Sequence, residues 1–464
     1  LSSAAVMAAG PLLYFPTDTL QNISWGITAS AEETGAGTES GSQTWTEGNL
    51  TWTLDTDGTM TISGEGVMKS YRIGNSPATQ KEDSVKKVVI EYGVTSIGEY
   101  AFYDCSSLTS IEIPESVTSI GDFAFGYCSR LTDITIPGSV TSIGESAFSY
   151  CIRLTDITIP GSVTSIGASA FANCTSLTGL EIPGSVTSIG GAAFGYCTNL
   201  TSITIPKSVT SIGSNVFYDC AALKEVLLEN GSTLTSENLG VSESKIATYW
   251  NEDNLTWTLT ADGTTMTISG SGAMKAYYWT AGSPATQKKD NVKKVVIEEG
   301  VTSIGNYAFD GCGGLTSIEI PKGVTSIGNY AFKNCSSLTS ITIPGSVTSI
   351  GYNAFQDCSS LTDITIPGSV TSIREGTFKD CTSLTNINIP ENITSIGDDA
   401  FSGTPWLTNK QQENNSLVIV NGILIDGTTC SGEVTIPDGV TRIGDSAFQN
   451  CTDLTSIVIP EGVK

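Results

Sequence analysis

The segment ITIPGSVTSIGESAF, residues 134–148, recurs along the chain with changes at only a few positions. Close copies begin at Ile157, Ile203 and Ile341. The cysteines follow the same repetition, because eleven of the twelve fall into series with steps of 23 residues. A fixed period of this length indicates stacked repeat units, and a chain of 464 residues is too long for one hydrophobic core. The cysteines in register are Cys105, Cys128, Cys151, Cys174, Cys197 and Cys220, then Cys312, Cys335, Cys358 and Cys381, and Cys451 after an interruption.

Each unit has the pattern L-x-x-I-x-I-P-x-x-V-x-x-I-G-x-x-A-F-x-x-C-x-x. The alternation of Ile134 and Ile136 predicts a short strand, which Pro137 ends because proline has no N–H for a strand ladder. A helix is excluded because the IP and TSIG elements interrupt any period of 3.6 residues. One unit cannot bury enough apolar surface to fold alone, so the coils must stack. The pattern therefore predicts a β-rich solenoid with parallel strands and 23-residue coils.

A second motif occurs twice outside the repeat. The segment NLTWTLDTDGTMTISG from Asn49 returns as NLTWTLTADGTTMTISG from Asn254. Alternating apolar residues on both sides of an Asp-Gly pair predict a β-hairpin, which we interpret as the cap of a stack of coils. The chain then contains two stacked-repeat blocks. The predicted parts are residues 45–84 (first cap), 85–229 (first solenoid), 230–253 (linker or hinge, with a break in the stack), 254–291 (second cap) and 292–464 (second solenoid).

The second block is interrupted at about residues 402–433. The segment LVIVNGILI, residues 417–425, predicts a hairpin with a tight Asn-Gly turn, set in a protruding or widened coil. The sequence stops within a repeat, at IPEGVK, so we expect the natural protein to continue.

The first residues have a different composition. Residues 1–15, LSSAAVMAAGPLLYF, are uncharged and mostly apolar, and an A-x-A pattern follows at residues 29–31. This predicts that residues 1–31 are the remnant of a secretory signal peptide, the alternative being an ordered N-terminal extension. Residues 32–44 are polar and rich in Gly and Ser, which is typical of a flexible spacer.

The net charge is −25, with 47 acidic and 22 basic residues. This disfavours nucleic acid and anionic membranes as partners and favours a cationic partner or bound cations. The chain has no histidine, which removes the commonest general base and the commonest metal ligand. No run of 18 apolar residues is present, so we expect no membrane insertion within this chain.

The cysteines could suggest disulfides or a metal site. Consecutive coils lie about 4.8 Å apart, within disulfide range, but their side chains should point in parallel into one core. We therefore predict buried free thiols and no metal site, with Cys430, which is out of register, as the accessible thiol. Residues 55–58 and 261–263 resemble fragments of a calcium loop but lack its downstream Glu, and hairpin turns explain them better.

The repeat resembles the BspA-like class of bacterial leucine-rich repeats over about residues 85–228 and 292–463. The resemblance implies a leucine-rich-repeat solenoid and a secreted or cell-surface protein that adheres to host proteins or other cells. Members of this class are described as binding extracellular-matrix and plasma proteins such as fibronectin and fibrinogen. The motif residues are core residues, so the resemblance transfers no binding site.

Variable positions facing outward from the strands are where we expect ligand contacts. They carry small, hydroxylated and acidic side chains, without the Trp, Tyr and Arg that anchor tight interfaces. The alternative is a solvated face that binds nothing. The candidate ligand-contact residues, called the strand row below, are Glu112, Asp133, Thr135, Asp156, Thr158, Glu181, Thr204, Glu319, Thr342, Asp363, Thr365 and Asn388.

Aromatic residues also repeat in two phases near the cysteine. Such rows are either stacked structural ladders or a contact surface. A structural role is slightly favoured, because a Tyr ring can lie on the next coil and keep its hydroxyl in water. One phase holds Tyr127, Tyr150 and Tyr196, and the other Tyr100, Phe123, Tyr307 and Tyr330.

These observations together predict a non-enzymatic adhesion or ligand-binding protein, secreted or on the cell surface, without a cofactor. Its expected partners are proteins or glycoproteins on host or neighbouring cells, bound by many weak contacts that low salt or calcium strengthens. The alternative is a structural spacer that displays another part of the protein.

Overall fold

The structure is a computed structural model that describes residues 41–463 except 279, 281 and 414–415. The predicted signal-peptide remnant, residues 1–31, and most of the predicted spacer, 32–44, lie outside the described residues. The side chain of Asp133 does too. Within the described ranges, no helix is long and apolar enough to cross a membrane.

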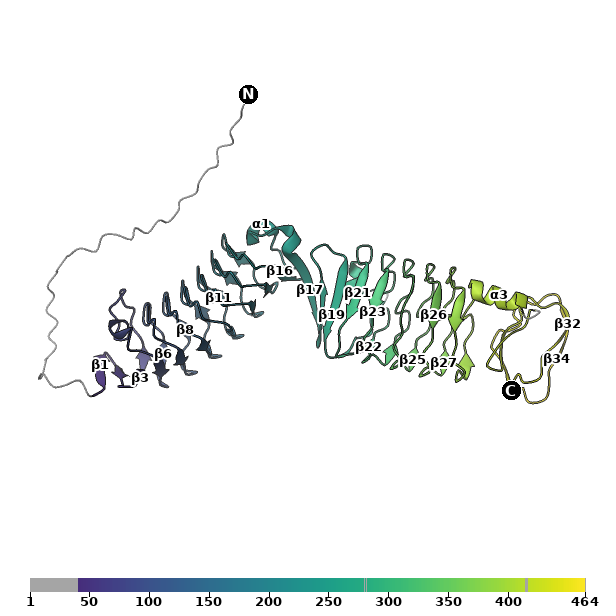
Figure 1. Ribbon diagram of the computed structural model, residues 1–464, viewed down its shortest axis with the longest axis horizontal. Helices are drawn as coiled ribbons and strands as arrows, with labels where there is room; N and C mark the ends of the chain where they lie inside the picture. The colour runs from purple at the N-terminus through teal and green to yellow at the C-terminus, as the bar shows by residue number, and fades with distance from the viewer. Residues whose placement is uncertain (1–40, 279, 281, 414–415, 464) are drawn as a thin grey trace, which may run out of the picture. The chain divides into compact units, whose positions relative to one another are not determined.

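Most coils contribute two short parallel strands (Figure 1), whereas the coils of Ile157 and Ile341 contribute only the second of them. The I-x-I segment forms a strand of the first row and pairs in register with the next coil, as Ser110 does with Asp133. The T-S-I-G segment forms the second row, where Ile143 lies beside Ile120 and Ile166. The prediction of a parallel-strand solenoid with 23-residue coils is confirmed.

The strands of the first block lie in two rows, and the first row is interrupted between β9 and β12. The first row contains β5 (Lys87–Ile90), β7 (Ser110–Glu112), β9 (Asp133–Ile134), β12 (Gly179–Glu181), β14 (Ser202–Ile205) and β16 (Glu225–Glu229). The second row contains β6 (Val94–Ser96), β8 (Ser119–Ile120), β10 (Ser142–Ile143), β11 (Ser165–Ile166), β13 (Ser188–Ile189) and β15 (Ser211–Ile212).

The second block repeats this arrangement. Its first row contains β21 (Lys294–Ile297), β23 (Ser317–Glu319), β26 (Asp363–Thr365) and β28 (Asn386–Asn388). Its second row contains β22 (Val301–Ile304), β24 (Ser326–Ile327), β25 (Ser349–Ile350), β27 (Ser372–Ile373) and β29 (Ser395–Ile396).

The motif residues form the core. Phe148 is fully buried, and its ring stacks on those of Phe125 and Phe171 with 5.4 Å between centroids on either side. The same ladder runs through both blocks at 5.3 to 5.9 Å. Each coil therefore buries its Phe only against its neighbours, which is why the sequence must repeat.

Both predicted hairpins are present as antiparallel strands. In the first copy β1 (Gln43–Glu47), β2 (Leu50–Leu54) and β3 (Thr59–Gly64) pair in sequence, and β3 then pairs in parallel with β5. The remaining elements of this copy are β4 (Gly66–Val67) and a 3-10 helix, η1 (Thr79–Lys81). The second copy contains β17 (Ile246–Glu252), β18 (Leu255–Leu259), β19 (Thr265–Gly270), β20 (Gly272–Ala273) and α2 (Pro284–Gln287). That the hairpins act as caps remains a prediction.

The expected break in the stack at residues 230–253 is wrong for the strand ladder. This segment contains α1 (Ser236–Leu239) and η2 (Glu243–Lys245) and then β17, which pairs in parallel with β16 and antiparallel with β18. Because β17 is an extended strand that pairs along both of its edges, the hydrogen-bonded sheet continues from β16 through β17 to β18 and so joins the two blocks. The buried side chains still form one cluster up to Leu239 and another from Trp250. A hinge here and the domain boundaries remain predictions.

The predicted hairpin in the second block is present as β30 (Val418–Val420) and β31 (Ile423–Asp426), joined at Asn421 and Gly422. A helix, α3 (Pro405–Glu413), precedes it and was not predicted. The described residues then continue with β32 (Gly432–Thr435), β33 (Arg442–Ile443) and β34 (Leu454–Val458). Because β31 pairs in parallel with β33, the insertion widens one coil without leaving the stack.

Candidate functional site

The strand row lies on the outer side of the first-row strands. Ten of its twelve side chains are exposed, Thr204 is half-buried, and that of Asp133 is not described. Parallel pairing puts equivalent members side by side, so Glu181 lies opposite Thr204 and Thr365 opposite Asn388. The residues of each block therefore share one face, as the alternation in the strands predicts. The first-block members are Glu112, Asp133, Thr135, Asp156, Thr158, Glu181 and Thr204, and the second-block members are Glu319, Thr342, Asp363, Thr365 and Asn388.

Two carboxylates of the row are paired with lysines that sequence reasoning missed. Lys87 Nζ lies 2.5 Å from Glu112 Oε1, and Lys294 Nζ lies 2.6 Å from Glu319 Oε1. Both pairs join the first strand of a block to its second strand, so the two blocks begin alike. The segment KKVVIE, which occurs at the start of both blocks, could have indicated these lysine–glutamate pairs from the sequence. Because both partners are well exposed, each pair adds at most about 1 kcal/mol to stability.

A hollow interrupts the row in the middle of the first block. Residues 155–159 are not assigned to a strand, and a cavity of about 430 Å³ is lined there by Asp156, Thr158 and Glu181. Gly179, which also lines it, has no side chain where neighbouring coils carry Ser or Asp. The hollow presents two exposed carboxylates and a hydroxyl, which suit hydrogen-bond donors or cations.

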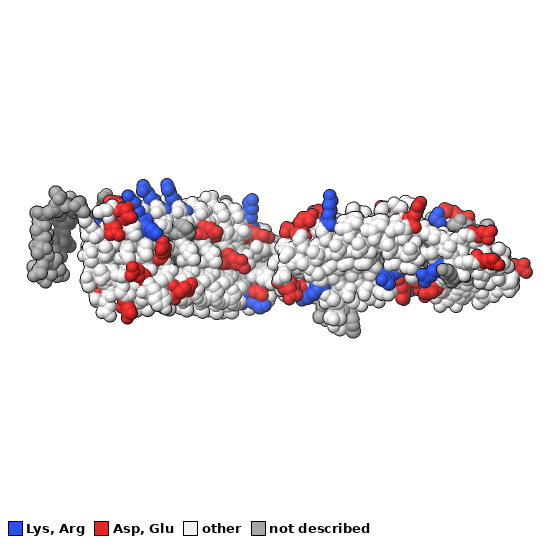
Figure 2. All heavy atoms as spheres, turned by 90° about the horizontal axis from the view of Figure 1, so that it is seen from below, with Lys and Arg blue, Asp and Glu red and all other residues white. Residues whose placement is uncertain are grey.

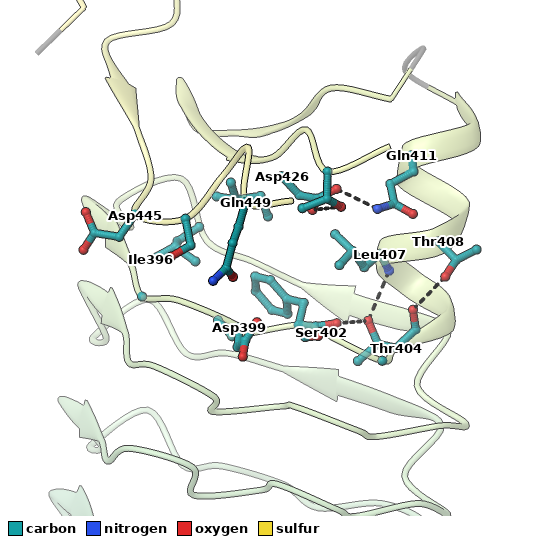
Figure 3. A pocket seen from close by; sticks show the side chains of 17 residues that line it. Ile396, Asp399, Ser402, Thr404, Leu407, Thr408, Gln411, Asp426, Asp445 and Gln449 are labelled. Atoms are coloured by element: carbon teal, nitrogen blue, oxygen red, sulfur yellow. Dashed lines mark hydrogen bonds between the residues drawn. The ribbon is translucent and has the colours of Figure 1, made fainter. Parts of the chain in front are cut away.

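A second cavity, of about 260 Å³, lies beside the insertion (Figure 3). Asp426, which is buried there, accepts hydrogen bonds from Gln411 Nε2 at 2.6 Å and from Thr428 Oγ1 at 2.8 Å. Asp399 and Asp445 also line the cavity. Because both Asp426 oxygens have protein partners, this carboxylate holds α3 to β31, and we assign it a structural role.

Ten of the eleven repeat cysteines are buried, as predicted, and the exception is Cys451. All twelve cysteines are free thiols, and Cys451 is the half-buried one among them. The prediction that Cys430 is accessible is wrong, because it packs in a small core around the insertion and is only 5% exposed. Among the described residues no group of three or more His, Cys, Asp or Glu could hold a metal ion.

Charged residues are scattered over the face of the blocks that Figure 2 shows. Figure 2 shows Asp and Glu side chains spread over a face that is largely uncharged. The excess of acidic residues is therefore distributed over this face without forming one dense patch.

A family model described as "BspA type Leucine rich repeat region (6 copies)" matches residues 75–201, 164–245, 282–415 and 426–464. These ranges cover most of the chain and coincide with the coils described above. The chain belongs to the BspA-type leucine-rich repeat family. The resemblance predicted from the repeat pattern is thereby confirmed, and no curated protein sequence matches this BspA-type chain significantly.

Several solved structures are similar to this BspA-type chain. A leucine rich cell surface protein from Faecalibacterium prausnitzii A2-165 is 31% identical, covering 89% of this chain and 94% of its own, with a TM-score of 0.32. A leucine-rich repeat protein from Bacteroides ovatus ATCC 8483 is 26% identical, covering 89% and 100%, with a TM-score of 0.32. One from Eubacterium ventriosum ATCC 27560 is 24% identical, covering 91% and 98%, with a TM-score of 0.29.

Proposed function

We propose that this chain is a non-enzymatic ligand-binding protein, secreted or on the cell surface, that uses the strand row to hold a protein or glycoprotein ligand. The observation that carries the proposal is the exposed, in-register row of carboxylates, hydroxyls and amides on one face of each block. Membership of the BspA-type family supports the surface location.

The ligand is held by many weak contacts. Exposed carboxylates and hydroxyls each contribute little, so useful affinity requires one ligand to engage several coils. The ligand should be cationic or rich in hydrogen-bond donors, since the row offers mainly acceptors and the chain carries a charge of −25.

The test is binding of the full chain to immobilised matrix proteins and mucin at low and high salt. Replacing Asp156, Glu181 and Asp363 by Ser should weaken binding several-fold. A matched control replaces three exposed glutamates outside the row, Glu65, Glu237 and Glu391, and changes the net charge equally. Equal loss in both variants would indicate a non-specific charge effect. Absence of binding at any salt would favour the structural spacer.

A further inference from the structure

In each coil, the segment that runs from the second-row strand to the cysteine position forms a third side. This segment contains two residues with left-handed backbone conformation. One lies five residues before the cysteine position and the other directly before it. In the second block the position directly before the cysteine holds only Gly, Asn or Asp: Gly311, Asn334, Asp357, Asp380 and Asn450. In the first block it holds Asp104, Tyr127, Tyr150, Asn173, Tyr196 and Asp219.

Tyr127, Tyr150 and Tyr196 are energetically unfavourable in this backbone conformation. Their φ angles are 62°, 61° and 59°, a region in which Gly, Asn and Asp are tolerated and bulky side chains are rare. The second block builds the same coil without a tyrosine at this position, so the fold does not require one. Residues held in unfavourable conformations that the fold does not need point to a function.

The rings form a partly exposed surface. Tyr127, Tyr150 and Tyr196 are 39%, 38% and 43% exposed. The rings of Tyr127 and Tyr150 stack with centroids 4.3 Å apart, and Tyr103 lies 5.4 Å from Tyr127. We call these rings, with the stacked pair Tyr100 and Phe123, the aromatic strip; its members are Tyr100, Tyr103, Phe123, Tyr127, Tyr150 and Tyr196.

The coil of Asn173 interrupts the strip. It lies between the coils of Tyr150 and Tyr196, which are therefore roughly 10 Å apart. Among the described residues the only ring recorded against Tyr150 is Tyr127. Among the described residues, no ring therefore stacks on the side of Tyr150 that faces Asn173.

Carboxylates surround the strip. Burial, and then the nearby carboxylates of Glu99, Asp122 and Glu145, raises the pKa of Tyr100. Asp104 lies close enough to Tyr103 and Tyr127 to contribute to their raised pKa values. Residues 95–223 contain ten acidic residues against three basic ones, Arg130, Arg153 and Lys207. The carboxylates beside the strip, together with the negative charge of the block as a whole, therefore attract cations.

The second block shows what such rings accept. Lys333 Nζ lies 5.6 Å from the ring centroid of Tyr330, and the Arg374 guanidinium lies 5.5 Å from that of Tyr352. Both distances fit cation–π contacts.

The first block lacks these cations. In its repeats the position of Lys333 is taken by residues such as Gly126, and that of Arg374 by residues such as Gly144. Among the described residues, the Lys and Arg side chains recorded over a ring all belong to other parts of the chain. No Lys or Arg of the described residues lies over a ring of the strip, so a cation of another molecule can take that place.

We infer that the aromatic strip is a second binding surface, separate from the strand row, that takes a lysine- or arginine-rich peptide segment of a partner protein. The basic side chains lie on the ring faces and edges between the flanking carboxylates. The planar guanidinium of arginine and the ammonium of lysine both suit such a surface.

The test uses the full chain and a synthetic peptide of alternating lysine and glycine. The variant Tyr127→Asn, Tyr150→Asn, Tyr196→Asn should bind this peptide about tenfold more weakly or worse. Its thermal midpoint should equal or exceed that of the parent, because Asn suits the left-handed backbone. A purely structural ladder gives the opposite pattern, with a lower midpoint and unchanged peptide binding, and would overturn the inference.

Matched variants make the test specific. The variant with Phe in place of Tyr127, Tyr150 and Tyr196 should still bind the peptide, because the ring and not the hydroxyl contacts the cation. Tyr352→Asn, at an equally exposed tyrosine of the second block, should leave peptide binding unchanged. Equal binding of a serine-for-lysine peptide, or binding of a neutral oligosaccharide in its place, would overturn the ligand class. The Ser variants of the strand row should keep peptide binding, so the two proposals fail separately.

Discussion

The Cys151 thiol donates a hydrogen bond to the backbone carbonyl of Phe125, in the preceding coil, with 3.3 Å between Sγ and oxygen. The same bond, over 26 residues, recurs in both blocks. Each of these thiols thus joins two neighbouring coils through a backbone carbonyl oxygen, and all of them are free cysteines.

The repeat thiols should be unreactive in the folded protein. Burial raises the pKa of Cys151 well above its ordinary value, so little of the reactive thiolate forms near pH 8. A thiol reagent at that pH should label Cys451 first, and all twelve cysteines once the unreduced chain is denatured. Rapid labelling of several thiols in the native protein, or few in the denatured one, would contradict this account.

Replacement of Phe148 by Ala should cost about 3–5 kcal/mol of unfolding free energy, because it leaves a cavity between two stacked rings. Since neighbouring coils supply each other's core, amide hydrogen exchange should accelerate in the adjacent coils as well. The control is Ile152→Ala, at a side chain 41% exposed, which should change stability by less than about 0.5 kcal/mol. Exchange confined to the mutated coil would show that coils fold independently.

Stability should fall at high pH, in part through two equivalent tyrosines. Tyr71 donates a hydrogen bond to Glu47, and Tyr277 to Glu252. Burial, followed by this bond, raises the pKa of both hydroxyls above their usual value near 10. The stabilisation is complete below pH 10 and is lost as pH rises above it, because the unfolded chain then releases protons that the folded chain retains.

The measurement is urea denaturation at pH 8 and pH 11 of the parent and of the double variant Tyr71→Phe, Tyr277→Phe. Buried thiols contribute to the same loss, so the difference between the two proteins is the quantity of interest. The variant should be less stable at pH 8, by about 1 kcal/mol for each lost bond, and should lose less stability on going to pH 11. Parallel losses would show that the tyrosines do not titrate as stated.

The sequence predicted the coil because the repeated core residues are compatible with only one kind of structure. An Ile pair followed by Pro137, and a Phe and a Cys returning every 23 residues, fit only stacked short strands. The helix α3 was missed because its segment carries no apolar period and is fixed by neighbouring contacts, such as the bond from Trp406 N to the Leu384 carbonyl.

The candidate sites could be predicted only in part. The outward direction of the strand row follows from alternation, but the pairing of Lys87 with Glu112 needs the register between a hairpin-derived strand and the first repeat. Tyr127 points to a binding surface because its φ angle is positive, and a sequence pattern does not show φ angles. Comparison of the two blocks at that position would have raised the question, since only the first places tyrosine there.

Deletion of a whole coil tests whether binding by the strand row is distributed along the block. Removing residues 152–174 brings the flanking coils into contact with unchanged register, because the strands at Ile143 and Ile189 pair with the same partner strand in the same way. The protein should fold, with circular dichroism per residue unchanged, and bind its ligand several-fold more weakly. Removing residues 336–358 from the second block serves as the matched deletion and should cause a loss of similar size. If the first deletion abolishes binding while the second has no effect, the ligand occupies the hollow at Asp156 and Glu181, and the affinity is local.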